Sequence, residues 1–187
     1  MKITFANTKG GVGKTTSAIF CAQIMHNRDE SVEVWDADPQ GSACMWADQA
    51  ELDFPVVPAN LATLKRPTRN KWVFIDTPPG NAEMISAATT DADLVVVPTR
   101  ASMSDIPRMW ATLHALDTQQ PKAVLITEAE PRTQMFRSLT ENLDEAGIAL
   151  LPSILKRKMF KEVPGQKPTV MWGYSQVVTE IQEALAE

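Results

Sequence analysis

Asn7-Thr8-Lys9-Gly10-Gly11-Val12-Gly13-Lys14-Thr15-Thr16 is the stretch that decides the fold of this 187-residue chain. It joins a strand-like apolar segment, residues 2–6, directly to a helix-like segment, residues 14–26. Glycines in such a loop let backbone N–H groups close around phosphate oxygens, and the following helix offers its positive N-terminus. At the start of that helix, the Lys14 ammonium is placed to reach the β/γ-phosphates and the Thr15 hydroxyl to bind Mg²⁺. The predicted phosphate-binding residues are Gly10, Gly11, Val12, Gly13, Lys14, Thr15 and Thr16.

Outward from this loop, short apolar runs alternate with longer helical patterns, which is typical of an α/β protein with a mostly parallel sheet. Several runs are almost continuously apolar, as expected for strands covered by helices on both faces. The expected strands are residues 2–6, 32–35, 72–75, 94–97, 123–127 and 149–154, with a weaker one near 54–57. The expected helices are residues 14–26, 42–49, 82–89, 103–116, 133–146 and 174–186. We therefore expect a single domain over residues 1–187 with a twisted sheet, and a surface loop at 55–70.

Composition and charge narrow the class of protein. Hydrophobic residues make up 44% of the chain and charged residues 22%, which is ordinary for a globular domain with a sizeable core. The two cysteines, Cys21 and Cys44, have neither the spacing nor the density of a metal or disulfide framework, which fits a reducing cytoplasm. No apolar run approaches 18 residues and the N-terminus leads straight into a strand, so neither a membrane span nor a signal peptide is expected. Because the net charge is −5, any contact with nucleic acid requires a local basic patch.

Two acidic motifs follow later strands. Trp35-Asp36-Ala37-Asp38-Pro39-Gln40 ends the second strand, at the edge where open α/β sheets bind ligands. Its two aspartates are spaced to lie on the same side of an extended chain. Val73-Phe74-Ile75-Asp76 is an apolar strand that ends in an aspartate, the Walker B arrangement, which predicts that Asp76 holds Mg²⁺ through water. A turn with a helix cap also explains a DxDP sequence, but phosphoryl transfer needs a water-positioning group, which favours the functional interpretation.

The three motifs together resemble those of the ParA/MinD family of deviant Walker A ATPases. In the general GxxxxGK[ST] pattern the first glycine falls on Thr8, and the next residue is a second lysine, Lys9. The resemblance implies that Lys9 crosses a dimer interface to the nucleotide of the partner. The alternative for Lys9 is a solvated loop charge. The implied catalytic residues are Lys9, Lys14 and Asp38, and Lys9 joins the nucleotide-binding set.

The same resemblance assigns roles to the aspartates and to the segment after Asp76. It implies that Asp38 positions or activates the attacking water and that Asp36 supports the Mg²⁺ shell. Pro78, Pro79 and Gly80 resemble the second switch of the family, which responds to the γ-phosphate. The implied metal-binding set is Thr15, Asp36, Asp38 and Asp76.

The nucleotide is expected to be ATP, because residues 123–129 lack the NKxD-like motif with which GTPases read their base. We expect the base to contact the loops near residues 127–128 and 152–153, with Pro152 as the named candidate. The C-terminal helix is acidic on its polar face, which disfavours a membrane anchor of the MinD type. The resemblance is therefore strongest to short ParA partition proteins that lack an N-terminal DNA-reading domain.

This resemblance implies an ATP-dependent homodimer that binds DNA without sequence preference and releases it on hydrolysis. It also implies a centromere-binding, ParB-like adaptor that stimulates a weak basal ATPase activity, and a nucleoid-associated location in the cytoplasm. DNA binding of this kind needs clustered Lys and Arg side chains for phosphate contacts. The predicted DNA-binding residues are Arg132, Lys156, Arg157, Lys158 and Lys161, although basic runs are often solvated faces.

Two other functions remain open. One is a MinD-like positioning ATPase that acts on a protein cargo or the division machinery. The other is a nucleotide-binding module that scaffolds partners without meaningful hydrolysis. The intact set of Lys14, Asp38 and Asp76 argues against the module, and a basal ATPase assay separates the two.

Overall fold

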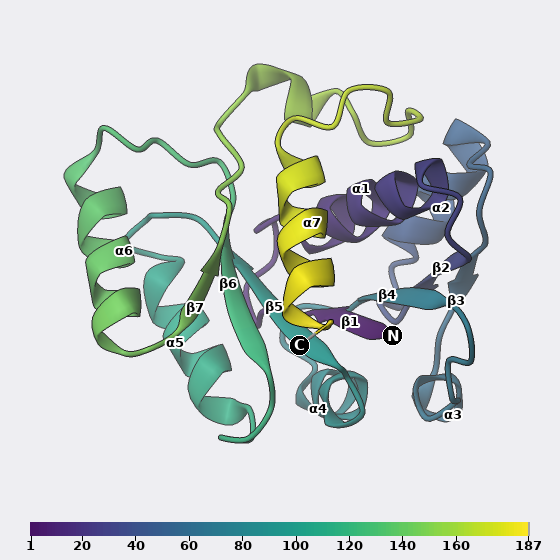
Figure 1. Cartoon of the computed structure of the whole chain (residues 1–187), viewed down its shortest axis with the longest axis horizontal. Coiled ribbons are helices and arrows are strands. Elements are labelled where there is room, and N and C mark those ends of the chain that lie inside the picture. Colours follow the sequence, from purple (N-terminus) through teal and green to yellow (C-terminus); the bar gives the residue numbers. More distant parts are fainter. Residues whose placement is uncertain (187) are drawn as a thin grey trace.

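The computed structural model of the chain describes residues 1–186, and of Lys161 only the backbone (Figure 1). The strands are β1 (Lys2–Phe5), β2 (Val32–Asp36), β3 (Val56–Pro58), β4 (Trp72–Asp76), β5 (Leu94–Thr99), β6 (Lys122–Ile126) and β7 (Ala149–Leu151). The helices are α1 (Lys14–Asn27), α2 (Ser42–Ala50), α3 (Leu61–Leu64), α4 (Ala82–Thr90), α5 (Ile106–Ala115), α6 (Gln134–Glu145) and α7 (Tyr174–Ala184), with a 3₁₀ turn, η1 (Lys158–Lys161).

The seven strands form one sheet in the order β3-β2-β4-β1-β5-β6-β7, and every pair in it is parallel. Each crossover between parallel strands needs a helix or a long connection, which explains the alternation in the sequence. Register across the central strands places Asp36 beside Asp76, and Asp76 beside Phe5. The predicted fold class, a parallel sheet with helices on both faces, is therefore confirmed.

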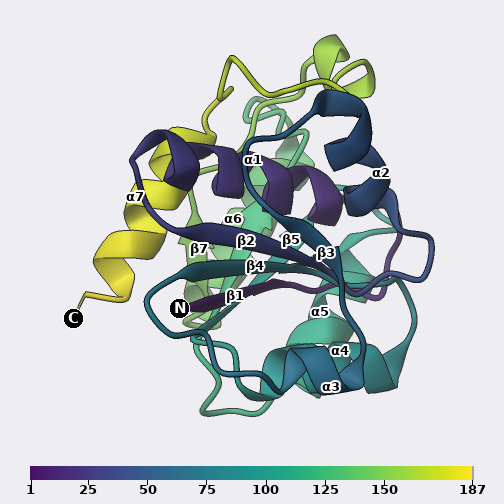
Figure 2. The ribbon, with the colours of Figure 1, turned by 90° about the vertical axis from the view of Figure 1, so that its right-hand side faces the viewer.

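The sheet divides the hydrophobic core into two layers. Helices α1, α2 and α7 cover one face, whereas α3, α4, α5 and α6 cover the other (Figure 2). Alternate residues of a strand point to opposite faces, so Ile3 and Phe5 pack under α1 while Thr4 between them faces α4. The Thr4 hydroxyl is buried and donates to the carbonyl of Ala88 at 2.6 Å, which satisfies a polar group in the core.

Most element boundaries agree with the sequence prediction within two residues, and three parts of the chain differ more. The last strand ends at Leu151 because Pro152 has no N–H for the sheet ladder. The helix expected from residue 103 begins at Ile106, with Pro107 in its first turn. The segment 55–70, expected as a surface loop after the weaker strand near 54–57, contains the short helix α3 in addition to β3. The Asn60 side chain caps α3 by accepting from the amides of Ala62 and Thr63, a local signal that the loop prediction overlooked.

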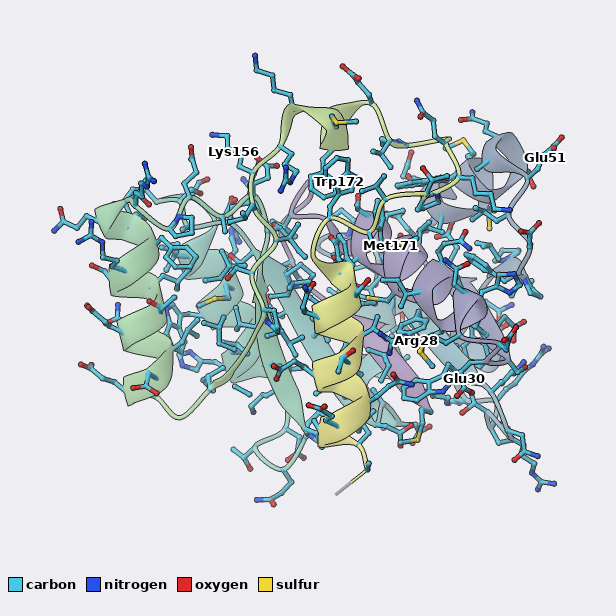
Figure 3. The ribbon with its side chains drawn as sticks, turned by 45° about the horizontal axis from the view of Figure 1, so that its top comes forward. Arg28, Glu30, Glu51, Lys156, Met171 and Trp172 are labelled. Carbon is cyan, nitrogen blue, oxygen red and sulfur yellow. The ribbon has the colours of Figure 1, made fainter. Side chains whose placement is uncertain are left out.

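A long connection, residues 155–173, crosses one edge of the sheet between β7 and α7, at the top of Figure 1. We call it the strap. The Trp46 indole of α2 donates to the carbonyl of Gln166 at 2.8 Å, and the Arg157 guanidinium lies 4.8 Å from the ring centroid of Trp172. Figure 3 shows Lys156 and Trp172 above α7 on this side of the molecule. Across residues 1–186, no helix is long and apolar enough to cross a membrane.

Candidate functional site

The phosphate loop between β1 and α1 is shaped by glycines and braced by the end of β6. Gly13 has a φ of 92°, and a Cβ there would lie 3.3 Å from the Thr127 methyl carbon. A side chain at this position would be strained both by its backbone angle and by Thr127. The Thr127 hydroxyl in turn donates to the carbonyl of Val12 at 2.9 Å. The loop is therefore fixed before any ligand binds.

Lys14 begins α1 and reaches back over the phosphate loop. Its side chain is largely buried, and its ammonium donates to the carbonyl of Lys9 at 3.1 Å. Burial lowers the pKa of Lys14, while the charges of Asp76 and Asp38 raise it. A phosphate oxygen would supply the anionic partner that a buried ammonium needs, and the N-terminus of α1 favours the same negative charge.

Thr15 and Asp76 form the part of the site that fits Mg²⁺. The Thr15 hydroxyl donates to Oδ2 of Asp76 at 2.6 Å, whereas Oδ1 of Asp76 is buried and has no hydrogen-bond partner among the described residues. Burial, opposed by the Thr15 hydrogen bond, raises the pKa of Asp76 to about 7. A hard cation held by a hydroxyl, nucleotide phosphates and a carboxylate, directly or through water, satisfies both features. These residues therefore fit a Mg²⁺ ion that accompanies a nucleotide.

The two aspartates after β2 have different surroundings. Asp36 is buried, and its two carboxylate oxygens accept from the backbone amides of Asp38 and Cys44, at 3.1 and 2.9 Å. It therefore fixes the turn and the start of α2, while its role in the metal shell stays a prediction. Asp38 is half-buried and faces the pocket beside the phosphate loop. Among the described residues, no group of three or more acidic, His or Cys side chains could hold a metal ion by itself.

We expect opposite effects on stability from Asp76→Asn and Asp36→Asn in the absence of nucleotide. Asp76→Asn removes a carboxylate whose ionisation is unfavourable in the fold, and should raise Tm by about 5 °C at pH 8. The penalty from Asp76 is absent below the ordinary carboxyl pKa of 3.8, grows with rising pH and is complete above about 7. The gain in Tm should therefore be smaller at pH 5 than at pH 8.

Asp36→Asn should instead lower Tm by about 5 °C, because an amide NH₂ then faces a backbone N–H. Thermal unfolding of both variants at pH 5 and pH 8 measures the difference. Equal losses of Tm in the two variants would show that Asp76 is an ordinary structural carboxylate.

Lys9 lies at the rim of the site. Its side chain is 37% exposed, and its ammonium is 4.0 Å from the buried carboxylate of Asp105, which the Arg100 guanidinium contacts at 2.5 Å. Lys9 differs from the other residues of the predicted loop set because it does not line the pocket that the described residues form. Its position leaves the ammonium accessible from outside the molecule, as a contact with a second subunit requires, and that contact stays a prediction.

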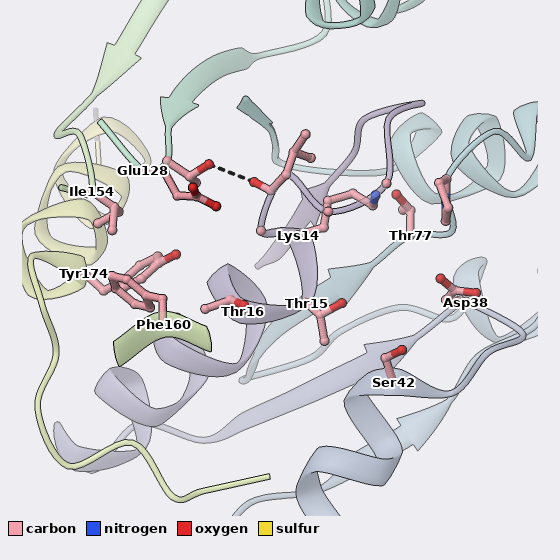
Figure 4. Close-up of a pocket in the computed structure, with 16 residues that line it drawn as sticks. Lys14, Thr15, Thr16, Asp38, Ser42, Thr77, Glu128, Ile154, Phe160 and Tyr174 are labelled. Atoms are coloured by element: carbon pink, nitrogen blue, oxygen red, sulfur yellow. Dashed lines mark hydrogen bonds between the residues drawn. The ribbon is translucent and has the colours of Figure 1, made fainter. Parts of the chain in front are cut away.

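The phosphate loop borders a pocket of about 340 Å³ that has two chemically different ends (Figure 4). Asp38 and Thr77 lie toward one end, close to Lys14 and Thr15. The opposite end holds residues that the sequence analysis did not single out as a group: Glu128, Ile154, Phe160 and Tyr174. Of the two loops expected to contact the base, the first places Thr127 and Glu128 in the lining of the pocket, and their contact with a base stays a prediction. In the second loop the lining residue is Ile154, and Pro152 is not part of the lining.

The backbone of Glu128 has an unusual conformation that the sequence does not indicate. Its φ is 47°, in the left-handed region that a residue with a Cβ adopts at a cost. Such conformations gather at ligand sites, because the surrounding structure must hold them in place.

The predicted DNA-binding residues come from two neighbouring loops. Lys156 forms an ion pair with Glu130 at 3.1 Å, and its amide donates to the carbonyl of Ala129, so the start of the strap lies beside the loop that carries Arg132. Arg157 packs on Trp172, and Lys158 is exposed. The Lys161 side chain lies outside the described part of the chain.

A parallel α/β sheet with this loop, its lysine and a strand-end aspartate on the threonine hydroxyl defines a P-loop nucleotide-binding protein. More specifically, the chain belongs to the CobQ/CobB/MinD/ParA nucleotide-binding family, whose model matches residues 3–170. This match confirms the predicted family. Members of its ParA/MinD branch are nucleotide-hydrolysing ATPases.

Curated relatives include two kinds of protein. "Maintenance of carboxysome distribution protein A" from Gloeobacter kilaueensis is 35% identical over 140 residues, which are 70% of this chain and 64% of that protein. The chain thus matches less than two thirds of that relative. Protein ParA from Rhizobium radiobacter is 25% identical over 181 residues, which are 84% of this chain and 79% of that protein.

Solved structures share the fold. A plasmid partition protein from Borrelia burgdorferi B31, bound to AMPPNP, has a TM-score of 0.77 at 17% identity, covering 98% of both chains. Apo McdA from Cyanothece has a TM-score of 0.78 at 18% identity, covering 97% of this chain and 98% of its own. At such identities these likenesses bear on the fold alone.

Proposed function

We propose that this protein is an ATP-driven positioning ATPase, which cycles between a monomer and an ATP-bound dimer to distribute a cargo in the cell. The observation that carries the proposal is the gathering of Lys14, Thr15–Asp76 and Asp38 on one pocket, with the accessible Lys9 at its rim. A protein assembly is the favoured cargo, because three of the curated relatives are named for maintaining carboxysome distribution. The protein-cargo alternative of the sequence analysis thus becomes the main proposal.

Different residues of the pocket have different roles in the proposed hydrolysis. Amides of the phosphate loop and the Lys14 ammonium hold the β/γ-phosphates, and Mg²⁺, when bound, neutralises charge that develops on their oxygens. Asp38, which lines the pocket beside the phosphate loop, holds and orients the water that attacks the γ-phosphate. Lys9 of a second subunit adds positive charge to the phosphates, so that turnover depends on dimerisation. Loss of the γ-phosphate removes that anchor and releases the dimer.

The proposal is tested by measuring mass in solution and phosphate release together. Light scattering should give a dimer with ATP and a monomer with ADP, and turnover per subunit should rise with protein concentration. A monomer that hydrolyses ATP at a concentration-independent rate would contradict the role of the second subunit. Binding without any turnover would instead favour the scaffolding module.

DNA partition is the second candidate, and one observation favours it. The strap and the loop of Arg132 lie side by side through the Lys156–Glu130 pair, so basic residues far apart in sequence share one surface. The experiment is binding to a duplex of arbitrary sequence with ATP, with ADP and without nucleotide, at two salt concentrations. Salt-sensitive binding with ATP alone supports a nucleoid-bound form, because phosphate contacts weaken as salt rises. Absence of binding in every state, with turnover intact, leaves the protein-cargo proposal alone.

Arg157→Glu combined with Lys158→Glu should weaken DNA binding at least ~10-fold and leave ATP turnover unchanged. Both residues are on the strap, and reversal of their charges repels phosphate. The matched control is Lys65→Glu with Arg66→Glu, which makes the same charge change on exposed residues just after α3, on the opposite face of the sheet. Fluorescence anisotropy with labelled duplex measures both. Equal weakening by the two pairs would mean that net charge, and not this surface, governs binding.

A further inference from the structure

An aromatic cluster, Phe20, Phe160 and Tyr174, lies at one end of the pocket and has no role in the proposed hydrolysis. Phe160, in η1, is half-buried and lines the pocket. Its ring centroid is 5.9 Å from that of Phe20 in α1 and 6.4 Å from that of Tyr174 in α7. The Tyr174 hydroxyl is hydrogen-bonded to Ser17 at 3.0 Å, so the ring beside Phe160 is itself fixed. The ring of Phe160 is therefore held in place with part of its surface facing the pocket.

This cluster lies at the end of the pocket opposite Asp38 and Thr77 (Figure 4). A nucleoside triphosphate also has two ends, an anionic chain and a flat apolar base. With the phosphates held at Lys14 and the start of α1, the base extends toward Ile154 and Phe160. Aromatic side chains bind the π-face of a base favourably, which gives Phe160 a ligand of matching chemistry.

The same short turn also carries the basic surface. Arg157 and Lys158 lie three and two residues before Phe160, and the Phe160 amide donates to the carbonyl of Arg157 at 3.3 Å. A hydrogen bond from Trp46 of α2 and the ion pairs of Lys156 and Lys167 hold the strap on either side of η1. Within η1, the Phe160 ring packs against Phe20 and Tyr174 of the body. A ligand that contacts this ring therefore acts on the backbone that positions Arg157 and Lys158.

We propose that Phe160 binds the base of the nucleotide, and that the bound base holds the strap against the body of the protein. The inference deepens the proposed function and rests on it, because it requires ATP to bind in this pocket. Phosphates alone leave η1 without this contact. The strap thus responds to the presence of a base, a step that is separate from the response of Asp38 and Lys9 to the γ-phosphate.

The first test separates contact with the base from contact with the phosphates. Phe160→Ala should bind ATP about 10-fold more weakly than the wild type, the usual effect of losing one base–aromatic contact. Its affinity for inorganic tripolyphosphate, which has no base, should be unchanged. Met159→Ala is the matched control, because Met159 is the adjacent residue of η1 and is 51% exposed. Isothermal titration calorimetry with both ligands measures all three proteins.

The second test follows the strap directly. ATP should slow tryptic cleavage after Lys158 at least ~3-fold in the wild type, tripolyphosphate should not, and ATP should lose its effect in Phe160→Ala. If Phe160 only packs the core, its removal weakens both ligands equally or neither, and the inference is overturned. If the wild type binds neither ATP nor tripolyphosphate, the proposed function itself fails. Binding of both by the wild type, with ATP affinity unchanged in Phe160→Ala, refutes the inference alone.

Discussion

The Lys14→Ala protein is expected to bind ATP about 100-fold more weakly than the wild type, the effect of losing a charge-assisted contact in a partly dry site. Lys14 is largely buried, and among the described residues its ammonium donates to the Lys9 carbonyl alone, so it is ready for a phosphate oxygen. Alanine also leaves the charges of Asp76 and Asp38 without the cation that opposes them. The measurement is the Kd for ATP by calorimetry, with and without Mg²⁺.

Lys9→Ala is the control for this prediction, since it removes the other lysine of the same loop. Its ammonium points away from the pocket toward Asp105, so the monomer should bind ATP with nearly unchanged affinity. Dimerisation and turnover should be lost, because the lysine then cannot reach the phosphates of a partner. A tight ATP dimer of Lys9→Ala would refute its role across the interface, and a normal Kd for Lys14→Ala would move the phosphates elsewhere.

Asp38→Asn should slow ATP hydrolysis by a factor of about 100 to 10,000, the range observed when a group that takes or positions a proton is removed. Asp38 faces the pocket from the loop after β2. One of its carboxylate oxygens accepts from the Gln40 amide at 2.9 Å, whereas both oxygens of Asp36 accept from backbone amides, so Asp38 has the greater capacity to hold water. Binding of ATP should persist, so the variant should accumulate as an ATP-bound dimer. Phosphate release in single turnover, together with light scattering, measures both effects.

Asp48→Asn provides the matched control for Asp38→Asn. It makes the same chemical change on an exposed residue of α2, and turnover should stay within about twofold of the wild type. An Asp38→Asn protein that hydrolyses ATP at the rate of this control would exclude Asp38 as the water-positioning residue.

Asp36 and Asp38 show which features of the site could be predicted from the sequence and which could not. DADPQ predicts that two carboxylates lie at the end of a strand beside the phosphate loop; Asp36 ends β2, and Asp38 lines the pocket that the loop borders. It assigns both to metal or water chemistry, whereas the structure gives Asp36 two backbone amides as partners. Those amides depend on how the chain turns into α2, and a turn of this kind leaves no separate signal in the sequence. The different hydrogen-bond partners of Asp36 and Asp38 therefore became clear only from the structure.

The end of the pocket opposite Asp38 also shows what the sequence could not predict, here because the residues that meet there are far apart in the chain. Residues 127–128 were predictable, because a loop that follows a parallel strand must open at the ligand-binding edge. Phe160 was not predictable, because it follows the last strand on a connection with no periodic pattern. Tyr174 starts the predicted C-terminal helix, but the sequence does not indicate that this end of the helix reaches the pocket. Their position depends on packing against Phe20, which is more than 100 residues away in the chain.

The sequence by itself determined the phosphate loop, the aspartate at the end of β4 and the parallel α/β class. Each of these is set by local chemistry: glycine backbone angles, amides at a helix start, and an apolar run that ends in a carboxylate. Tertiary structure alone decided that Phe160 lines the pocket and that Lys156 lies beside the loop of Arg132. These outcomes depend on contacts between distant segments, whose free energy arises only when the whole sheet and its two helical layers have assembled.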